Sequence, residues 1–138
     1  RVFGYGGRFT RHSFDAIDHT SYLIEFENGA VAYGEASWAM PGTFPFTTYL
    51  EIAGSRGLLV VDNRSTSTIQ VYGERNTYSY SYYERDPYYN ELKAFIRWIL
   101  YDEPVRISPE EALESLRVAL AINRSIETRE IISLRRGV

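Results

Sequence analysis

The feature that most constrains how this chain can fold is the dipeptide Asn28-Gly29, which joins two strand-like segments. Asn and Gly both tolerate the positive φ angles that a two-residue type I′ turn requires. The pattern therefore predicts a β-hairpin with these two residues as its loop. Counting outward from that loop pairs Ile24 with Tyr33, because directly opposed residues of a hairpin share one face of the sheet.

This register predicts one face of the hairpin with large side chains and one with small side chains. The large face would hold Tyr22, Ile24, Phe26, Val31 and Tyr33. Neither face carries the charged residues typical of a solvated hairpin, so we expect both faces to be covered. The five large residues are the candidate interface through which the chain would form a homo-oligomer.

The rest of the chain changes its hydrophobic period from two to about 3.6 near residue 87. Before this point the alternation predicts about six or seven strands, including Phe46 to Ala53 and Tyr78 to Tyr82. After it, an apolar stripe predicts one helix from Pro87 to near Asp102. A second, largely buried helix begins at Ser108, where a capping box with Glu111 is predicted. A short strand from Ile131 to Leu134 closes the chain.

Strands followed by helices indicate an α+β fold. We expect an open, mainly antiparallel β-sheet with two C-terminal helices packed on one face. The length of 138 residues suits a single domain, residues 1–138, with one hydrophobic core. The sequence does not determine which sheet face the helices cover.

Composition excludes several classes of function. The net charge is −3 and the basic residues are dispersed, so nucleic acid is not an expected partner. No apolar run has the roughly 20 residues that a membrane helix needs. The chain has no Cys, which removes disulfides and thiolate metal sites and suits a cytoplasmic protein. It starts with Arg1 and shows no signal peptide, so we interpret it as a fragment or a processed chain.

The candidates for independent chemistry are few. Asp15 and His19 are four residues apart and would share one face of a helix, where they could orient each other for proton transfer. His19, however, leads directly into the first hairpin strand, so we interpret 15–19 as a loop and strand entrance. His12 is the only other histidine, and a lone histidine beside Arg11 is more often solvated than catalytic. We therefore assign this chain no catalytic residue, no cofactor-binding residue and no metal ligand of its own.

Several ordered motifs resemble the C-terminal domain of the glucose-fructose oxidoreductase, inositol dehydrogenase and rhizopine catabolism (Gfo/Idh/MocA) family of NAD(P)-dependent oxidoreductases. The motifs run from about residue 18 to the closing strand and keep the family's order. They are Asp18-x-Thr20, Phe26-Glu-Asn-Gly-Ala30, Glu35-Ala-Ser-Trp38, Glu51-Ile-Ala-Gly54-Ser-Arg-Gly57-Leu58, Tyr89-x-Glu91-Leu-x-x-Phe95, Ser108-Pro-Glu-Glu-Ala-Leu113 and Ala121-Ile-x-x-Ser125-Ile-Glu-Thr128.

The resemblance implies a substrate-binding and oligomerisation domain of an enzyme that acts on a sugar or cyclitol hydroxyl. It implies NAD or NADP for the parent protein, hydride transfer to or from the nicotinamide, and a Lys and a His outside this chain for the proton. The implied partners are an N-terminal dinucleotide-binding domain of the same parent and a small sugar or polyol. We expect this chain alone to bind neither nucleotide, because it has no strand, Gly-rich turn and helix in succession.

Four aromatic residues are the candidates for a pocket wall that faces the substrate: Trp38, Tyr83, Tyr88 and Tyr89. The alternative for these residues is packing or an oligomer interface, where Tyr and Trp are enriched. The alternative for the whole chain is a stand-alone, non-enzymatic module that binds carbohydrate or protein through an exposed aromatic sheet face.

Overall fold

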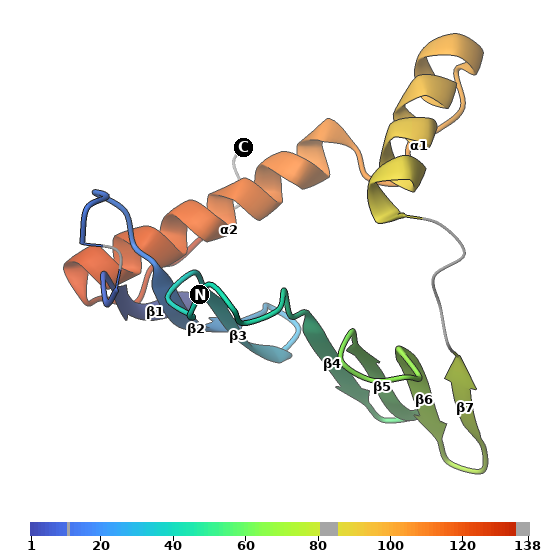
Figure 1. Ribbon diagram of the computed structural model, residues 1–138, viewed down its shortest axis with the longest axis horizontal. Coiled ribbons are helices and arrows are strands. Elements are labelled where there is room, and N and C mark those ends of the chain that lie inside the picture. Colours follow the sequence, from blue (N-terminus) through green and yellow to red (C-terminus); the bar gives the residue numbers. More distant parts are fainter. Residues whose placement is uncertain (11, 81–85, 135–138) are drawn as a thin grey trace. The chain divides into compact units, whose positions relative to one another are not determined.

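The computed structural model of this chain describes residues 1–10, 12–80 and 86–134 (Figure 1). The strands and helices within these ranges are β1 (Val2–Gly7), β2 (His19–Glu25), β3 (Val31–Ser37), β4 (Tyr49–Gly54), β5 (Gly57–Asp62), β6 (Ile69–Gly73), β7 (Thr77–Tyr80), α1 (Pro87–Tyr101) and α2 (Pro109–Thr128). They divide into two compact units, Arg1–Pro41 with Arg106–Val138 and Gly42–Val105, which we describe separately. The expected single domain stays a prediction.

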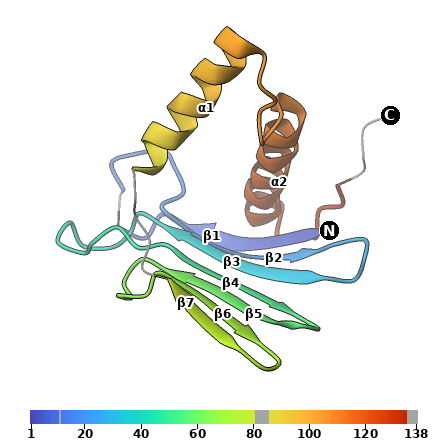
Figure 2. The same ribbon diagram turned by 90° about the vertical axis from the view of Figure 1, so that its right-hand side faces the viewer.

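The first unit is a three-stranded antiparallel sheet with β2 in the middle and helix α2 packed on β1 (Figure 2). The segment after α2 returns to the edge of β1. There, the Val2 amide donates to the Ile132 carbonyl at 2.8 Å, and the Ile132 amide donates to the Val2 carbonyl at 2.9 Å. The predicted closing strand is thus reduced to one β-bridge.

The contact between β1 and α2 requires a glycine and a serine. A Cβ atom at Gly4 would lie only 2.9 Å from the Ile122 carbonyl oxygen, so any side chain there would push the helix away. The Gly4 amide donates to Ser125 Oγ at 3.0 Å, and the Ser125 hydroxyl donates to the Glu130 carbonyl at 2.6 Å. Val2, Ala121 and Ile122 form the buried apolar core beside this contact.

The hairpin between β2 and β3 is confirmed, but its predicted loop and register are wrong. The Gly29 amide donates to the Phe26 carbonyl at 3.0 Å, and the Phe26 amide donates to the Ala30 carbonyl at 2.9 Å. The loop therefore has three residues, Glu27 to Gly29. Asn28, which a two-residue type I′ turn would place at positive φ, has a negative φ angle. Gly29 has φ 84°, as expected for a turn that ends in a left-handed residue.

The extra loop residue shifts the pairing by one position and so exchanges the two faces of β3. Tyr33 lies opposite Leu23, and Tyr22 lies opposite Gly34. The Tyr22 ring covers Gly34 so closely that a Cβ there would be 2.2 Å from the ring. The five predicted interface residues consequently do not share a face.

The sheet of the first unit therefore has one face covered by α2 and one uncovered face within this unit. Tyr22 and Ile24 pack against the core beside α2. Phe26 lies at the start of the turn and is half exposed. We call the uncovered face the open face. Its apolar residues are Phe3, Tyr5, Leu23, Val31 and Tyr33, and each is at least 39% exposed.

The second unit contains a four-stranded antiparallel sheet in the order β4-β5-β6-β7. Its register places one continuous apolar face on all four strands: Leu50, Ile52, Leu59, Val61, Ile69, Val71, Tyr78 and Tyr80. β4 begins at Tyr49, three residues later than predicted, because the Asn63 side chain binds the preceding backbone. It donates to the Phe46 carbonyl at 2.9 Å and accepts from the Thr48 amide at 2.9 Å. The predicted strand residues 81 and 82 lie outside the described residues.

The positions of both helices were predicted correctly. The predicted burial of the second helix is wrong. α1 starts after Asp86, whose carboxylate accepts a hydrogen bond from the Tyr88 amide, and it is followed by the C-cap residue Asp102 in a left-handed conformation. All α1 residues are exposed. α2 has the predicted capping box between Ser108 and Glu111. Only Ala121, Ile122 and Ser125 of α2 are buried, so the expectation of a largely buried helix is wrong in this chain.

The α+β class, with antiparallel strands and C-terminal helices, is confirmed. The strand pairing forms two sheets where we expected one open sheet, and α2 is the helix that packs on a sheet face. Among the described residues, neither helix is both long and apolar enough to cross a membrane.

Candidate functional site

The Asp15–His19 segment is a loop and strand entrance, as the sequence indicated, and not a helix. Asp15 is fully exposed and forms an ion pair with Arg8 at 3.2 Å. His19 is the first residue of β2 and is half buried, whereas His12 is exposed. In the part of the chain that the structure describes, no group of three or more His, Asp or Glu side chains is close enough to hold a metal ion.

Asp18 connects the two loops at this end of the sheet. Its side chain is 6% exposed and accepts hydrogen bonds from the amides of Phe9 at 2.8 Å and Thr10 at 2.9 Å. The Thr10 hydroxyl lies 3.2 Å from the same carboxylate. The Asp18 backbone carbonyl accepts from the Trp38 amide at 2.6 Å. One buried residue thus fixes the loop after β1 and the loop after β3.

These two loops border a shallow depression on the open face of the first unit, and this depression is wide open to solvent. It is lined by Phe9, His19, Ser37, Ala39 and Met40 and has a volume of about 310 Å³. We call it the His19 hollow. His19 and Ser37 are directly opposed in the sheet register, so they share its floor. The Phe9 ring meets the His19 ring edge-on, with centroids 5.8 Å apart.

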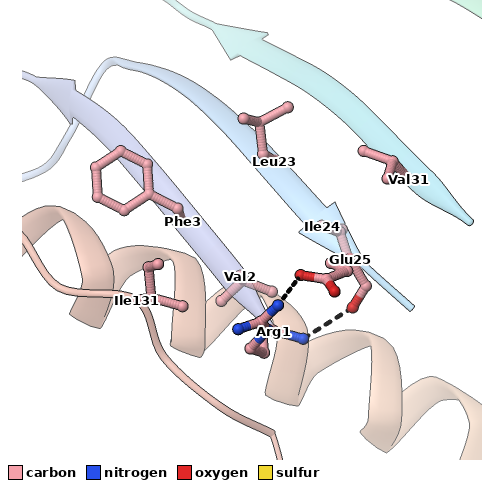
Figure 3. A pocket seen from close by; sticks show the side chains of 8 residues that line it. All are labelled: Arg1, Val2, Phe3, Leu23, Ile24, Glu25, Val31 and Ile131. Atoms are coloured by element: carbon pink, nitrogen blue, oxygen red, sulfur yellow. Dashed lines mark hydrogen bonds and ion pairs between the residues drawn. The ribbon is translucent and has the colours of Figure 1, made fainter. Parts of the chain in front are cut away.

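A second hollow of about 270 Å³ lies at the other end of the same sheet (Figure 3). Phe3, Leu23 and Val31 supply apolar side chains from three adjacent strands, and Ile131 joins them from the segment after α2. Arg1 and Glu25 form an ion pair at 2.5 Å along its rim. This hollow is mostly apolar and offers few polar groups to orient a small ligand, so it suits protein contact better than catalysis.

The four aromatic candidates for the pocket wall belong to different segments of the sequence. The Trp38 side chain is 79% exposed beside the His19 hollow, between two residues that line it. Tyr88 and Tyr89 lie in the first turn of α1, in the second unit, and are 74% and 49% exposed. Tyr83 lies outside the described residues. Their assignment as substrate-facing residues stays a prediction.

The residues that line the His19 hollow were missed at the sequence level, apart from His19 itself. The pairing of His19 with Ser37 depends on the hairpin register. The register predicted from a two-residue Asn-Gly loop differs from the observed one by one residue. Phe9 and Met40 come from loops whose conformation depends on Asp18. The one available signal was Asp18-x-Thr20, whose acidic residue directly precedes a strand.

Comparison with known proteins identifies the family. Residues 2–134 match the profile of the C-terminal alpha/beta domain of an oxidoreductase family, the Gfo/Idh/MocA family. This chain belongs to that family. The predicted resemblance is thereby confirmed over nearly the whole chain.

One curated relative of this Gfo/Idh/MocA domain is the myo-inositol 2-dehydrogenase of Thermotoga maritima. The two are 27% identical over 124 residues, which is 86% of this chain. The chain spans 36% of the length of that relative. The domain therefore corresponds to a part of a longer enzyme in this comparison.

Solved structures support the same fold at lower sequence identity. An oxidoreductase from Thermotoga maritima superposes with a TM-score of 0.80 at 18% identity, over 96% of this chain and 40% of that one. The UDP-N-acetylglucosamine 3-dehydrogenase of Acidithiobacillus ferrooxidans superposes with a TM-score of 0.77 at 20% identity, and the match covers 93% of this chain and 40% of that one. The WlbA dehydrogenase of Bordetella pertussis, in complex with NADH and UDP-GlcNAcA, superposes with a TM-score of 0.75 at 17% identity. This match covers 99% of this chain and 40% of that one.

Proposed function

We propose that this chain is the substrate-binding and oligomerisation domain of an NAD(P)-dependent oxidoreductase that acts on a sugar or cyclitol hydroxyl. The observation that carries the proposal is the family match over residues 2–134, which assigns the chain to the C-terminal alpha/beta domain of an oxidoreductase family. The names of the relatives support the substrate class, because they include a myo-inositol dehydrogenase and a dehydrogenase of a sugar nucleotide.

The proposal divides the work between this chain and the rest of its parent protein. The nucleotide and the hydride-transfer chemistry belong to an N-terminal dinucleotide-binding domain, because this sequence has no Gly-rich turn between a strand and a helix. This domain supplies part of the substrate pocket and the surface for assembly. The absence of Cys suits a reducing compartment, and we place the parent enzyme in the cytoplasm.

Self-association is proposed through the open face and not through the five residues named from the sequence. Phe3, Leu23, Val31 and Tyr33 lie together on this face and expose their apolar side chains. Closed two-fold pairing is the commonest way in which a protein buries such a face. Tyr22 and Ile24 are excluded because they pack against the core beside α2.

An activity assay of the protein encoded by the complete reading frame tests the proposal. We expect reduction of NAD⁺ or NADP⁺ with myo-inositol, an aldose or a UDP-sugar, measured by the absorbance of the reduced nicotinamide. The matched control is the separate chain of residues 1–138, which should show no turnover. A complete protein that binds these carbohydrates but reduces neither nucleotide would support a non-enzymatic binding module instead.

A further inference from the structure

The loop between β2 and β3 presents an Asn-Gly pair to solvent (Figure 2). Residues 25–31 are all exposed, and a Cβ built on Gly29 would meet no atom within 4 Å. Of the five asparagines in the sequence, only Asn28 is followed by glycine. The backbone nitrogen of Gly29 is therefore sterically accessible to the side-chain carboxamide of Asn28.

The order of the atoms in this pair allows an intramolecular reaction. The Gly29 nitrogen is bonded to the backbone carbonyl carbon of Asn28, so its attack on Asn28 Cγ closes a five-membered ring. Reacting groups that are already linked have a high effective concentration. A side chain on the following residue would crowd the attacking nitrogen, and glycine has none. An asparagine that precedes a larger residue lacks this second advantage.

A backbone amide is placed to stabilise the charge that the attack creates. Asn28 Oδ1 accepts a hydrogen bond from the Ala30 amide at 3.0 Å. Negative charge develops on this oxygen when a nucleophile adds to the carboxamide carbon, and a fixed N–H donor stabilises such charge. The Gly29 amide donates to the Phe26 carbonyl at 3.0 Å, so this bond has to open before the nitrogen attacks. Exposed loops open locally at little cost in free energy.

Two other asparagines serve as internal controls. The Asn63 carboxamide is held on both sides, because its oxygen accepts from the Thr48 amide and its nitrogen donates to the Phe46 carbonyl, each at 2.9 Å. Asn76 is exposed, but it is followed by Thr77, whose branched side chain crowds the backbone nitrogen. The first control has a restrained carboxamide, and the second has a hindered nucleophile.

We propose that Asn28 is a site of spontaneous deamidation, with water as the only co-reactant. The Gly29 nitrogen forms a bond to Asn28 Cγ and gives up its proton, and the carboxamide nitrogen takes up a proton and leaves as ammonia. Water then opens the resulting succinimide ring at one of its two carbonyl carbons. Cleavage of the bond from the nitrogen to Cγ gives aspartate, and cleavage of the bond to the backbone carbon gives isoaspartate. This inference does not depend on the proposed function.

The two products change the hairpin in different ways. Both add one negative charge to a loop that already contains Glu27. Isoaspartate also routes the main chain through the former side chain, which lengthens the loop by one carbon atom. The hydrogen bond from the Gly29 amide to the Phe26 carbonyl fits a loop of three ordinary residues, so isoaspartate should weaken the turn more than aspartate. The state of Asn28 thus records the age of the protein molecule.

Ageing of the purified chain in mildly alkaline buffer tests the proposal. We follow Asn28, Asn63 and Asn76 in the same samples by peptide mass mapping, and we detect isoaspartate with an isoaspartate-specific carboxyl methyltransferase. Asn28 should lose its amide steadily and give both products, while Asn63 and Asn76 keep theirs. The proposal is overturned by an unchanged Asn28, by conversion no faster than that of Asn76, or by aspartate without isoaspartate.

Asn28→Gln is the matched control variant. Glutamine keeps the carboxamide, but its additional methylene group makes the ring six-membered, and the closure of this ring is much slower. The ageing unsubstituted chain should develop an acidic band on isoelectric focusing, and Asn28→Gln should lack this band. An acidic band of equal strength in Asn28→Gln would locate the reaction at another residue and contradict the proposal.

Asn28→Asp supplies the aspartate product without isoaspartate. The fully aged chain should unfold at a lower temperature than Asn28→Asp, because only the aged chain contains the lengthened loop. Circular dichroism measures both unfolding midpoints. An aged chain that contains isoaspartate and is at least as stable as Asn28→Asp would contradict the weakening of the turn.

Discussion

At the scale of single residues, the Ser125 hydroxyl connects three segments of the first unit through two hydrogen bonds. The side chain is fully buried and links β1, α2 and the segment that follows α2. Ser125 was noted only as part of a motif shared with the family, and its structural role was not predicted, because a serine within a helix normally faces solvent or its own backbone. The partner of Ser125 is a backbone amide at Gly4, 121 residues away in the sequence.

Ser125→Ala should lower the free energy of unfolding by about 1–3 kcal/mol, because it leaves the Gly4 amide buried without an acceptor. Urea denaturation of the chain measures this change. Ser115→Ala is the control, since the Ser115 hydroxyl is exposed and bonds only within α2, to the Glu111 carbonyl at 3.2 Å. Equal midpoints for the two variants would show that the Gly4 amide finds another partner.

Gly29 should be sensitive to substitution because of its backbone and not because of its surroundings. Its φ is 84°, and a Cβ there would meet no atom within 4 Å. Gly29→Ala should therefore destabilise the chain by about 1–2 kcal/mol, the usual penalty of a left-handed residue with a side chain. Gly42→Ala is the control, because Gly42 is equally uncrowded and has no positive φ. Thermal unfolding compares them, and a Gly29→Ala chain as stable as Gly42→Ala would contradict the three-residue loop.

At the scale of elements, signals within a few residues of one another predicted where the helices start. The hairpin register and the position of the His19 hollow depend on contacts between distant residues, and the local signals did not predict them. Pro87, Ser108 and Glu111 act within one turn of the backbone, so the helix starts could be predicted. The hairpin was predicted for the same reason. Its register could not be, because Asn-Gly suits both a two-residue loop and the last two positions of a three-residue loop. The His19 hollow depends on that register and on Asp18, and so it was missed.

The N-terminus of α2 should make the chain sensitive to acid. Hydrogen bonds from its own backbone amide and from the Ser108 hydroxyl hold the pKa of Glu110 below its ordinary value of 4.5. A lowered pKa means that the carboxylate stabilises the folded state above pH 4.5, and that this contribution is lost as the pH falls through the folded-state pKa.

Glu110→Gln should remove this part of the acid sensitivity. Urea midpoints measured between about pH 7 and pH 3 should therefore fall less steeply for Glu110→Gln than for the unsubstituted chain. The control for the loss of one carboxylate from the same helix is Glu127→Gln, which lies in the last turn of α2 and far from its N-terminus. Identical slopes for Glu110→Gln and the unsubstituted chain would argue against stabilisation of the α2 N-terminus by the Glu110 carboxylate.

At the scale of the whole molecule, much apolar surface remains exposed. The buried apolar core of the described residues is small and lies between β1 and α2, while the open face and α1 expose large apolar side chains. Monomeric proteins rarely expose contiguous apolar patches of this kind. The hairpin pattern predicted an apolar sheet face for a second molecule to cover, but it named the wrong set of residues because the predicted register was one residue out.

Two adjacent residues on opposite faces of β2 test self-association. Leu23→Asp places a carboxylate on the open face, where it should block assembly and yield a folded monomer. Ile24→Asp places the same group against the core beside α2, where it should unfold the chain. Sedimentation velocity with circular dichroism distinguishes these outcomes. An unsubstituted chain that is monomeric at tens of micromolar, or a Leu23→Asp chain that still assembles, would refute the proposed interface.

Nucleotide binding tests the central claim most directly, namely that this chain is the domain of an oxidoreductase that holds substrate and not cofactor. Isothermal titration with NAD⁺, NADH, NADP⁺ and NADPH should be run on the chain of residues 1–138 and on the protein of the complete reading frame. The account predicts saturable micromolar binding of at least one nucleotide to the complete protein and none to the separate chain. Saturable micromolar binding to the separate chain, or none to the complete protein, would contradict it.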